Sequence, residues 1–158
     1  MLLTHCHFLL NRMRNILICM LLVVFHGPAS AETALDLDQH EGRVVLVDFW
    51  ASWCVPCRRS FPWMNEMHDK YSEAGLVIVA INLDNNAIDA AVFLDKYPPH
   101  FQIVYDTDRL IAREFGVQAM PSSFLIGRDG SVIDGHLGFK VKQQGEYEVA
   151  IVAALGDE

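Results

Sequence analysis

Cysteine is scarce in this sequence of 158 residues, which has only four: Cys6, Cys19, Cys54 and Cys57. The last two form the only CxxC pair. A tetrahedral zinc site made of thiolates needs four ligands, and no second CxxC pair exists to complete one. The histidines beyond residue 31 are scattered, with no pair at ligand spacing. The scarcity of these ligands predicts that the protein has no metal site.

Positive charge is also scarce. Beyond residue 31 the sequence has ten basic and twenty acidic residues, a formal net charge of −10. This balance supports solubility and argues against nucleic acid and anionic membrane surfaces as partners. It identifies no partner by itself, because an ordinary solvated acidic surface gives the same balance.

Long apolar runs are missing as well. The apolar run at residues 16–25 has ten residues, whereas a membrane-spanning helix needs about 20. It follows Arg12 and Arg14 and precedes the small residues 29–31. A positive region, an apolar run and a small-residue site are the three parts of a secretory signal peptide. We therefore predict a signal peptide over residues 1–31, with cleavage after Ala31.

Cleavage leaves residues 32–158, enough for one domain that buries about two thirds of its unfolded surface. The sequence from Met13 makes a complete signal by itself, so Met13 competes with Met1 as the true start. Export predicts a periplasmic protein, and an uncleaved signal would retain it at the inner membrane. The sequence leaves both outcomes open.

Apolar periodicity predicts alternating strands and helices. The run VVLVDFW at 44–50 is typical of a strand covered on both faces. Apolar residues at three- and four-residue spacing predict a helix at about 55–72, and Asp108 is a candidate cap for a helix at 109–115. The same reasoning predicts strands at 76–81, 102–105, 123–126 and 132–137, and helices at 88–96 and 146–155. This order indicates an α/β sandwich whose sheet is parallel early and antiparallel at its end.

Residues 49–62 read FWASWCVPCRRSFP and contain the CxxC pair. A structural disulfide here would close a loop of about four residues, which contributes only about 2 kcal/mol in the chain-entropy model. A domain with a strand as apolar as residues 44–50 hardly needs that contribution. Structural disulfides also usually join distant segments. The spacing therefore favours a redox pair over a staple.

The predicted helix start explains how such a pair would work. A helix that begins near Val55 places Cys54 at its N-terminal edge, where free N–H groups and the macrodipole lower the pKa of a thiol. Pro56 falls in the first helical turn, where its missing N–H costs nothing. Cys57 lies one turn away from Cys54. We therefore interpret Cys54 as the attacking thiol and Cys57 as the resolving thiol.

Asp48 is a carboxylate in the middle of an apolar strand. Burying it costs free energy unless it has a function. Its position near the strand end places it beneath the cysteines in our interpretation. Desolvation would raise its pKa, so that Asp48 could accept the proton of Cys57 and later return it.

The stretch VDFWASWCVPC resembles the thioredoxin superfamily, whose active site carries an aspartate and then WCxxC in this order and spacing. Pro62 matches the proline that kinks that family's first helix, and Met120-Pro121 resembles its cis-proline loop, which pairs with an extended substrate. The resemblance implies a thioredoxin-like three-layer α/β/α sandwich with a mixed central sheet. It also implies substrate-binding roles for Trp53, Pro56, Met120 and Pro121.

Within the superfamily, the chain is similar to the exported TlpA/ResA-like thiol–disulfide oxidoreductases. The CRRSFPWMN continuation resembles theirs, as does the additional segment 85–105 between central strands. Several relatives have a glutamate where this chain has Ser60, and some lack an acid at the position of Asp48. We therefore expect Asp48 to handle the proton. The lysine that thioredoxin places near its aspartate is missing from IVAINLD.

The resemblance implies a monomeric protein-disulfide reductase with no cofactor beyond the Cys54–Cys57 disulfide. Val55-Pro56 between the cysteines resembles the dipeptide of the reducing members. The expected partners are exported protein thiols and disulfides and a membrane electron donor of the DsbD/CcdA type. Cytochrome c maturation is the leading substrate hypothesis. Two other functions fit the same residues: a disulfide oxidase or isomerase, and a non-catalytic thioredoxin-fold binding module.

Overall fold

The structure, a computed structural model, describes residues 35–156. The predicted signal peptide and its cleavage site therefore lie outside the described residues. The strands are β1 (Val44–Trp50), β2 (Leu76–Asn82), β3 (Gln102–Tyr105), β4 (Ser122–Ile126) and β5 (Val132–Leu137). The helices are α2 (Cys57–Tyr71), α3 (Ala87–Lys96), α4 (Leu110–Glu114) and α5 (Gln144–Gly156), with 3-10 turns η1 (Asp38–His40) and η2 (Val141–Gln143).

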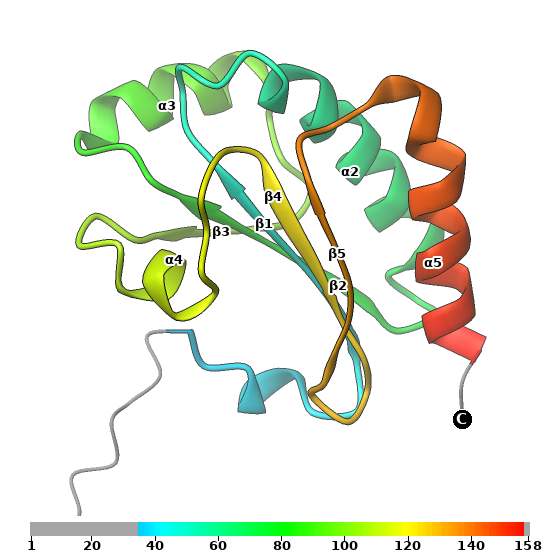
Figure 1. Cartoon of the computed structure of the whole chain (residues 1–158). Coiled ribbons are helices and arrows are strands. Elements are labelled where there is room, and N and C mark those ends of the chain that lie inside the picture. Colours follow the sequence, from blue (N-terminus) through cyan, green and yellow to red (C-terminus); the bar gives the residue numbers. More distant parts are fainter. Residues whose placement is uncertain (1–34, 157–158) are drawn as a thin grey trace, which may run out of the picture. The chain divides into compact units, whose positions relative to one another are not determined.

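The strands form one sheet in the order β3-β2-β1-β4-β5 (Figure 1). β1 is the central strand, and all seven of its residues are buried. It pairs in parallel with β2 and antiparallel with β4. β3 extends the parallel part and β5 the antiparallel part. The predicted mixed sheet is therefore confirmed.

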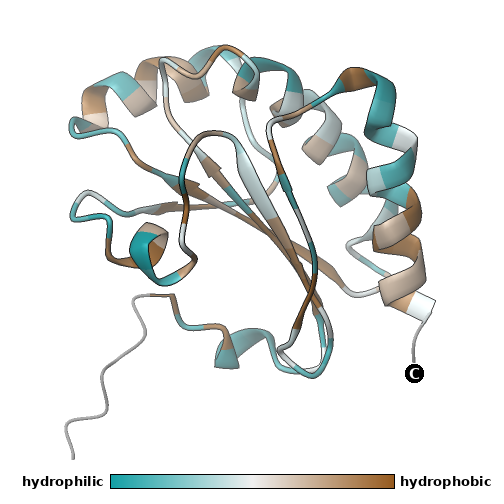
Figure 2. Ribbon diagram, viewed as in Figure 1, coloured by the Kyte–Doolittle hydropathy of each residue, from teal (hydrophilic) through white to brown (hydrophobic). Residues whose placement is uncertain are grey.

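Helices cover both faces of the sheet. Successive side chains of a strand point to opposite faces, so Leu46 and Trp50 pack in the core beneath α2, α3 and α5. Val47 and Phe49 pack in the second core, which α4 and the segment around Leu35 cover. Figure 2 shows hydrophobic residues concentrated on the central strands, between the more polar helices. The three-layer α/β/α arrangement is confirmed.

Most predicted elements lie where the sequence placed them. The strands at 102–105 and 132–137 match β3 and β5 in both bounds, and the strand at 44–50 matches β1. The additional segment 85–105 forms α3 and the edge strand β3, which pairs with β2. No helix within residues 35–156 is long and apolar enough to cross a membrane.

The predicted cap of α4 was wrong. The helix begins at Leu110, and the carboxylate that accepts its free N–H groups belongs to Asp106 rather than Asp108. Asp106 accepts from Leu110 N at 2.8 Å and from Ala112 N at 2.8 Å. Arg109, between Asp108 and the helix, has a φ of 56°. This turn carries the chain back over Asp106, which sequence spacing alone does not reveal.

Candidate active site

The CxxC pair lies between the end of β1 and the start of α2. Cys54 and Cys57 form a disulfide with their Cα atoms 5.3 Å apart. Both are buried, Cys54 with 3% of its surface exposed and Cys57 with none. The backbone N–H of Cys57 donates to Cys54 Sγ at 3.3 Å. A donor at a helix start that faces this sulfur would stabilise its thiolate and lower the pKa of the thiol.

α2 begins two residues later than predicted. Its first residue is Cys57, and Pro56 is the N-cap residue rather than a member of the first turn. Pro56 still starts the helical hydrogen bonding, because its carbonyl accepts from Ser60 N at 3.2 Å. Cys54 therefore precedes the helix, and the N–H that reaches its sulfur comes from Cys57 itself.

Asp48 is buried, with 1% of its surface exposed. Alternation along β1 places its side chain on the face of the sheet that α2 covers, together with Leu46 and Trp50. Burial raises the pKa of Asp48 to about 7, although a hydrogen bond from Ser123 lowers it in part. Within residues 35–156, Asp48 Oδ2 has no hydrogen-bond partner. A carboxyl with such a pKa can both accept and return a proton near neutral pH.

Ser60 of α2 is the position at which the resemblance drawn from the sequence implies a glutamate in several relatives. It is buried, and its hydroxyl donates to the carbonyl of Cys57 at 3.2 Å. The hydroxyl is thus engaged within α2. Of the two positions at which the resemblance suggested an acidic residue, Asp48 carries a carboxylate and Ser60 does not.

The Met120-Pro121 peptide bond is cis. This loop leads into β4, and the carbonyl of Pro121 accepts from Gly138 N at 2.7 Å. Ser122 Oγ donates to Ala119 O at 2.7 Å and closes the turn. Met120 is partly buried and contacts both cores.

The predicted substrate-binding residues differ in exposure. Trp53 is 63% exposed, whereas Pro56 and Met120 are half-buried and Pro121 is buried. Val55, which the sequence did not single out as a substrate-binding residue, is 59% exposed. Trp53 and Val55 flank Cys54 in the chain, so a partner that reaches this cysteine meets two exposed apolar side chains. Such a surface is suited to contact with another protein.

Two residues of the site were missed by sequence reasoning. Ser123 donates to Asp48 from the neighbouring strand β4. Asp84 is buried and accepts from the backbone N and the hydroxyl of Ser52, each at 2.9 Å. These bonds hold the loop that precedes Cys54. For Asp84, the only available signal in the sequence was its position next to the end of the apolar strand at 76–81. Nothing in the sequence indicated Ser123.

The described residues show no metal-binding cluster: within residues 35–156, no group of three histidine, cysteine, aspartate or glutamate side chains is placed so that it could hold a metal ion.

The chemistry that the arrangement of the cysteine pair and Asp48 supports is thiol–disulfide exchange. In the reduced protein, a thiol facing a helix-start N–H, a second thiol one turn away and a carboxyl with a near-neutral pKa would be suited to act as nucleophile, resolving group and proton carrier.

Comparison with known proteins agrees with this chemistry. The Redoxin family profile matches residues 21–152. Thiol-disulfide oxidoreductase ResA of Bacillus thuringiensis (strain Al Hakam) is 36% identical over 110 residues, which cover 70% of this chain and 64% of that protein. ResA of Bacillus subtilis (strain 168) is 33% identical over 99 residues, which cover 63% and 55%. The chain thus spans less than two thirds of the length of these relatives.

A solved structure from Chlorobium tepidum, provisionally named thiol:disulfide interchange protein DsbE, is also similar. Its sequence identity to this chain is 48%, its TM-score is 0.74, and the match covers 76% of this chain and 85% of that one. The sheet order, the placement of the cysteine pair and the cis-proline loop agree with the resemblance drawn from the sequence. The chain therefore belongs to the Redoxin family and has a thioredoxin-like α/β fold.

Proposed function

We propose that the protein is an exported thiol–disulfide oxidoreductase that reduces disulfides of exported proteins through Cys54 and Cys57. The observation that carries the proposal is the Cys54–Cys57 pair at the start of α2, with the Cys57 N–H directed at Cys54 Sγ. The buried Asp48, on the face of the sheet that α2 covers, supports the proposal. The names of the similar ResA and DsbE proteins support it as well.

The reaction begins with both cysteines reduced. The Cys54 thiolate attacks one sulfur of a substrate disulfide, forms a mixed disulfide and breaks the substrate S–S bond. The released substrate sulfur leaves as a thiolate and takes a proton from water. Trp53 and Met120 would contact the substrate on either side of the attacked sulfur, and the cis-proline loop would pair with its backbone.

The second step resolves the mixed disulfide. Cys57 loses its proton to the Asp48 carboxylate, and its thiolate attacks Cys54 Sγ. The Cys54–Cys57 disulfide forms, and the second substrate sulfur leaves as a thiolate that is protonated in turn. Two electrons have then passed from the protein to the substrate. Asp48 is suited to this role because its pKa of about 7 lets both of its protonation states exist at neutral pH.

Each turnover leaves the protein oxidised, so a dithiol donor must reduce Cys54–Cys57 again. The signal-like residues 1–31 support export to the periplasm, or retention at the inner membrane if the signal stays uncleaved. A membrane donor of the DsbD/CcdA type would then supply the two electrons. We further propose apocytochrome c as a substrate, on the basis of the TlpA/ResA resemblance.

Trapping the mixed disulfide tests the proposal most directly. Cys57→Ser lacks the resolving thiol, so covalent adducts at Cys54 should accumulate in periplasmic extracts and disappear on reduction. Cys54→Ser should form none, and it serves as the matched control. If Cys57→Ser yields no adducts and the wild type fails to reduce insulin with dithiothreitol, the redox function is wrong.

The direction of electron flow needs a separate measurement. A reduction potential near that of thioredoxin, about −270 mV, fits a reductase, whereas one near that of DsbA, about −120 mV, fits an oxidase. Equilibration of the Cys54–Cys57 pair with glutathione or dithiothreitol buffers gives this value. If an activity of the protein survives Cys54→Ser, a binding module replaces the redox function for that activity.

A further inference from the structure

Basic side chains are concentrated at the end of the molecule that carries the disulfide, although the whole chain is acidic. Residues 35–156 contain ten lysines and arginines. Three lie away from the cysteine pair and are engaged: Arg43 and Arg128 with backbone carbonyls, and Lys70 with Glu66 and Glu148. The other seven are Arg58, Arg59, Lys96, Arg109, Arg113, Lys140 and Lys142. Of these, Arg109 donates to the carbonyl of Leu83 at 3.4 Å.

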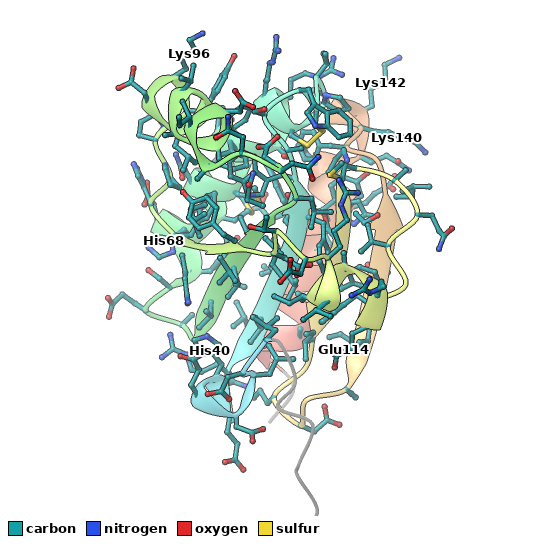
Figure 3. All side chains as sticks on the ribbon, turned by 90° about the vertical axis from the view of Figure 1, so that its left-hand side faces the viewer. His40, His68, Lys96, Glu114, Lys140 and Lys142 are labelled. Atoms are coloured by element: carbon teal, nitrogen blue, oxygen red, sulfur yellow. A yellow bond between two sulfur atoms is a disulfide. The ribbon has the colours of Figure 1, made fainter. Side chains whose placement is uncertain are left out.

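Arg58, Arg59, Lys96, Lys140 and Lys142 lie at the end of the molecule that carries the Cys54–Cys57 pair, whereas Arg109 and Arg113 lie beside Met120 of the cis-proline loop. Arg58 and Arg59 follow Cys57 directly in α2, and both are exposed. Lys140 lies two residues after Gly138, whose N–H donates to the carbonyl of Pro121 in the cis-proline loop. Figure 3 shows Lys96, Lys140 and Lys142 at the same end of the molecule as the disulfide, whereas His40 and Glu114 lie toward the other end.

Two surface hollows continue this basic surface. One has a volume of about 350 Å³ and is lined by Ser52 of the active-site loop, by Arg58 and Lys96, and by one carboxylate, Asp89. The other has a volume of about 140 Å³ and is lined by Met120 of the cis-proline loop. Arg109 and Arg113 line that second hollow. Each hollow thus joins two cations to a loop that would contact substrate.

Carboxylates near these cations in the sequence form no salt bridge with them in residues 35–156. Asp84 is buried and engaged with Ser52 and Asn82, and Asp106 is buried and engaged with the N–H groups of α4. The exposed carboxylates near the seven in the sequence are Asp89, Asp95, Asp108, Glu114 and Glu146. The hollow at the opposite end, of about 420 Å³, is by contrast lined by four carboxylates and two arginines: Asp38, Glu41, Glu114, Asp129, Arg43 and Arg128.

We propose that the surface around Cys54–Cys57 selects protein segments in which acidic residues flank the target disulfide. This inference rests on the proposed reductase function and adds its substrate class. The exposed apolar side chains of Trp53 and Val55 contact the segment at the cysteine, and the seven basic residues attract the flanking carboxylates. Complementary charge raises the rate of encounter with the correct partner and disfavours partners of the opposite charge.

A different role for the same cations would be to lower the pKa of the Cys54 thiol. That role changes the reactivity of the thiolate toward every substrate by the same factor. Selection of acidic segments instead changes the ratio of rates between acidic and neutral substrates. The ratio therefore separates the two roles.

The test uses pre-reduced full-length protein in single turnover with three synthetic peptides. All three carry the same intramolecular disulfide, flanked on both sides by Asp and Glu, by Ser and Gln, or by Lys and Arg. At low ionic strength we expect the acidic peptide to react about fivefold faster than the neutral one, and the basic peptide to react more slowly still. Raising the salt to about 0.5 M should bring the three rates together, because screening shortens the range of these charges.

The variant Lys140→Gln/Lys142→Gln should lower the ratio of acidic to neutral rates by about half or more. The matched control is Gln39→Glu/Ala153→Glu, which changes the net charge by the same amount at exposed positions away from the disulfide. It should keep the wild-type ratio. A ratio near one in the wild type, or the same loss in both double variants, overturns the proposal.

Two other results have distinct meanings. If the wild type reduces none of the three peptides, the proposed reductase function fails and not only its selectivity. If the wild type shows no acidic preference but binds phosphatidylglycerol vesicles, and Lys140→Gln/Lys142→Gln does not bind them, the basic surface faces a membrane. That result overturns the inference and leaves the redox function intact.

Discussion

The hydroxyl of Ser123 donates a hydrogen bond to the carboxylate of Asp48 at 2.5 Å, between strands that pair antiparallel at these two residues. Burial raises the pKa of Asp48 to about 7, and this bond acts against burial by stabilising the charged form. Ser123 thus sets how readily Asp48 ionises. The balance between desolvation and one hydroxyl places the titration of a buried carboxyl near neutral pH.

The first prediction concerns stability and pH. The folded-state pKa of Asp48 lies above the ordinary value of 3.8, so the folded protein holds this proton more tightly than the unfolded chain. Its contribution is fully present below pH 3.8 and is lost as the pH rises through about 7. Asp48→Asn does not titrate, so the variant does not lose this stability as the pH rises. The free energy of unfolding of the oxidised variant, relative to wild type, should therefore increase between pH 4 and pH 8 by up to about 4 kcal/mol.

Urea unfolding at a series of pH values measures this difference. Asp95→Asn is the matched control, because it removes the same charge from an exposed side chain. Its curve should run parallel to that of the wild type, apart from a few tenths of a kcal/mol. A difference between Asp48→Asn and wild type that stays constant from pH 4 to pH 8 would show that Asp48 ionises normally.

The second prediction concerns Ser123 and catalysis. Ser123→Ala removes the donor that stabilises ionised Asp48, so the pKa of Asp48 should rise further. The pH–rate profile for resolution of the mixed disulfide should then move upward by about one pH unit, the equivalent of a hydrogen bond to a charged group. Stopped-flow measurement of substrate release from a preformed mixed disulfide gives this profile.

Ser123→Thr separates the hydroxyl from other effects of substitution. It keeps the donor and has a β-branched side chain that suits a strand, so its profile should match that of the wild type. If Ser123→Ala and Ser123→Thr shift the profile equally, packing rather than the hydrogen bond controls the rate.

The third prediction concerns the core beneath the active site. Phe61 is buried and its ring lies 4.9 Å from those of both Trp50 and Phe93. Phe61→Ala should lower the free energy of unfolding by about 3–5 kcal/mol, because it removes apolar contacts and leaves a cavity. Val149→Ala, at a side chain that is 69% exposed, should change it by less than about 0.5 kcal/mol. Equal effects in urea unfolding would contradict the packing of this cluster.

Much of the fold could be predicted because its strands are long apolar runs with clear ends. The run at 44–50 is almost continuously apolar, which is typical of a strand buried on both faces, and β1 covers the same seven residues. Helix starts were harder. Val55 and Pro56 suit the first turn of a helix as well as the loop before it, so the sequence does not fix where the helix begins. In the structure both residues precede α2, which begins at Cys57.

The site was predictable as far as it lies within one segment. Cys54, Cys57 and Asp48 belong to one strand–loop–helix unit, and their order in the sequence already indicates their arrangement. Ser123 was not predictable, because its contact with Asp48 depends on the register between β1 and β4, 75 residues apart in the chain. Asp84 was missed for the same reason, since Ser52 lies 32 residues before it.

The last prediction concerns Asp84, whose carboxylate holds the loop before Cys54. It accepts from Ser52 N and Ser52 Oγ at 2.9 Å and from Asn82 Nδ2 at 2.8 Å. Asp84→Ala leaves the half-buried donors of Ser52 and the buried amide of Asn82 without their acceptor, which should cost about 1–3 kcal/mol of unfolding free energy. The looser loop should also misplace Cys54, so that the rate of attack on a peptide disulfide falls by about tenfold or more.

Ser52→Ala tests how this effect is divided. It removes the bond to the hydroxyl but keeps the bond from the backbone N–H, so its loss of rate should be smaller than that of Asp84→Ala. Asp108→Ala removes an exposed carboxylate from the turn before α4 and should keep the wild-type rate. If Asp84→Ala lowers stability but leaves the rate of attack and its pH dependence unchanged, Asp84 supports the fold without positioning the active-site loop.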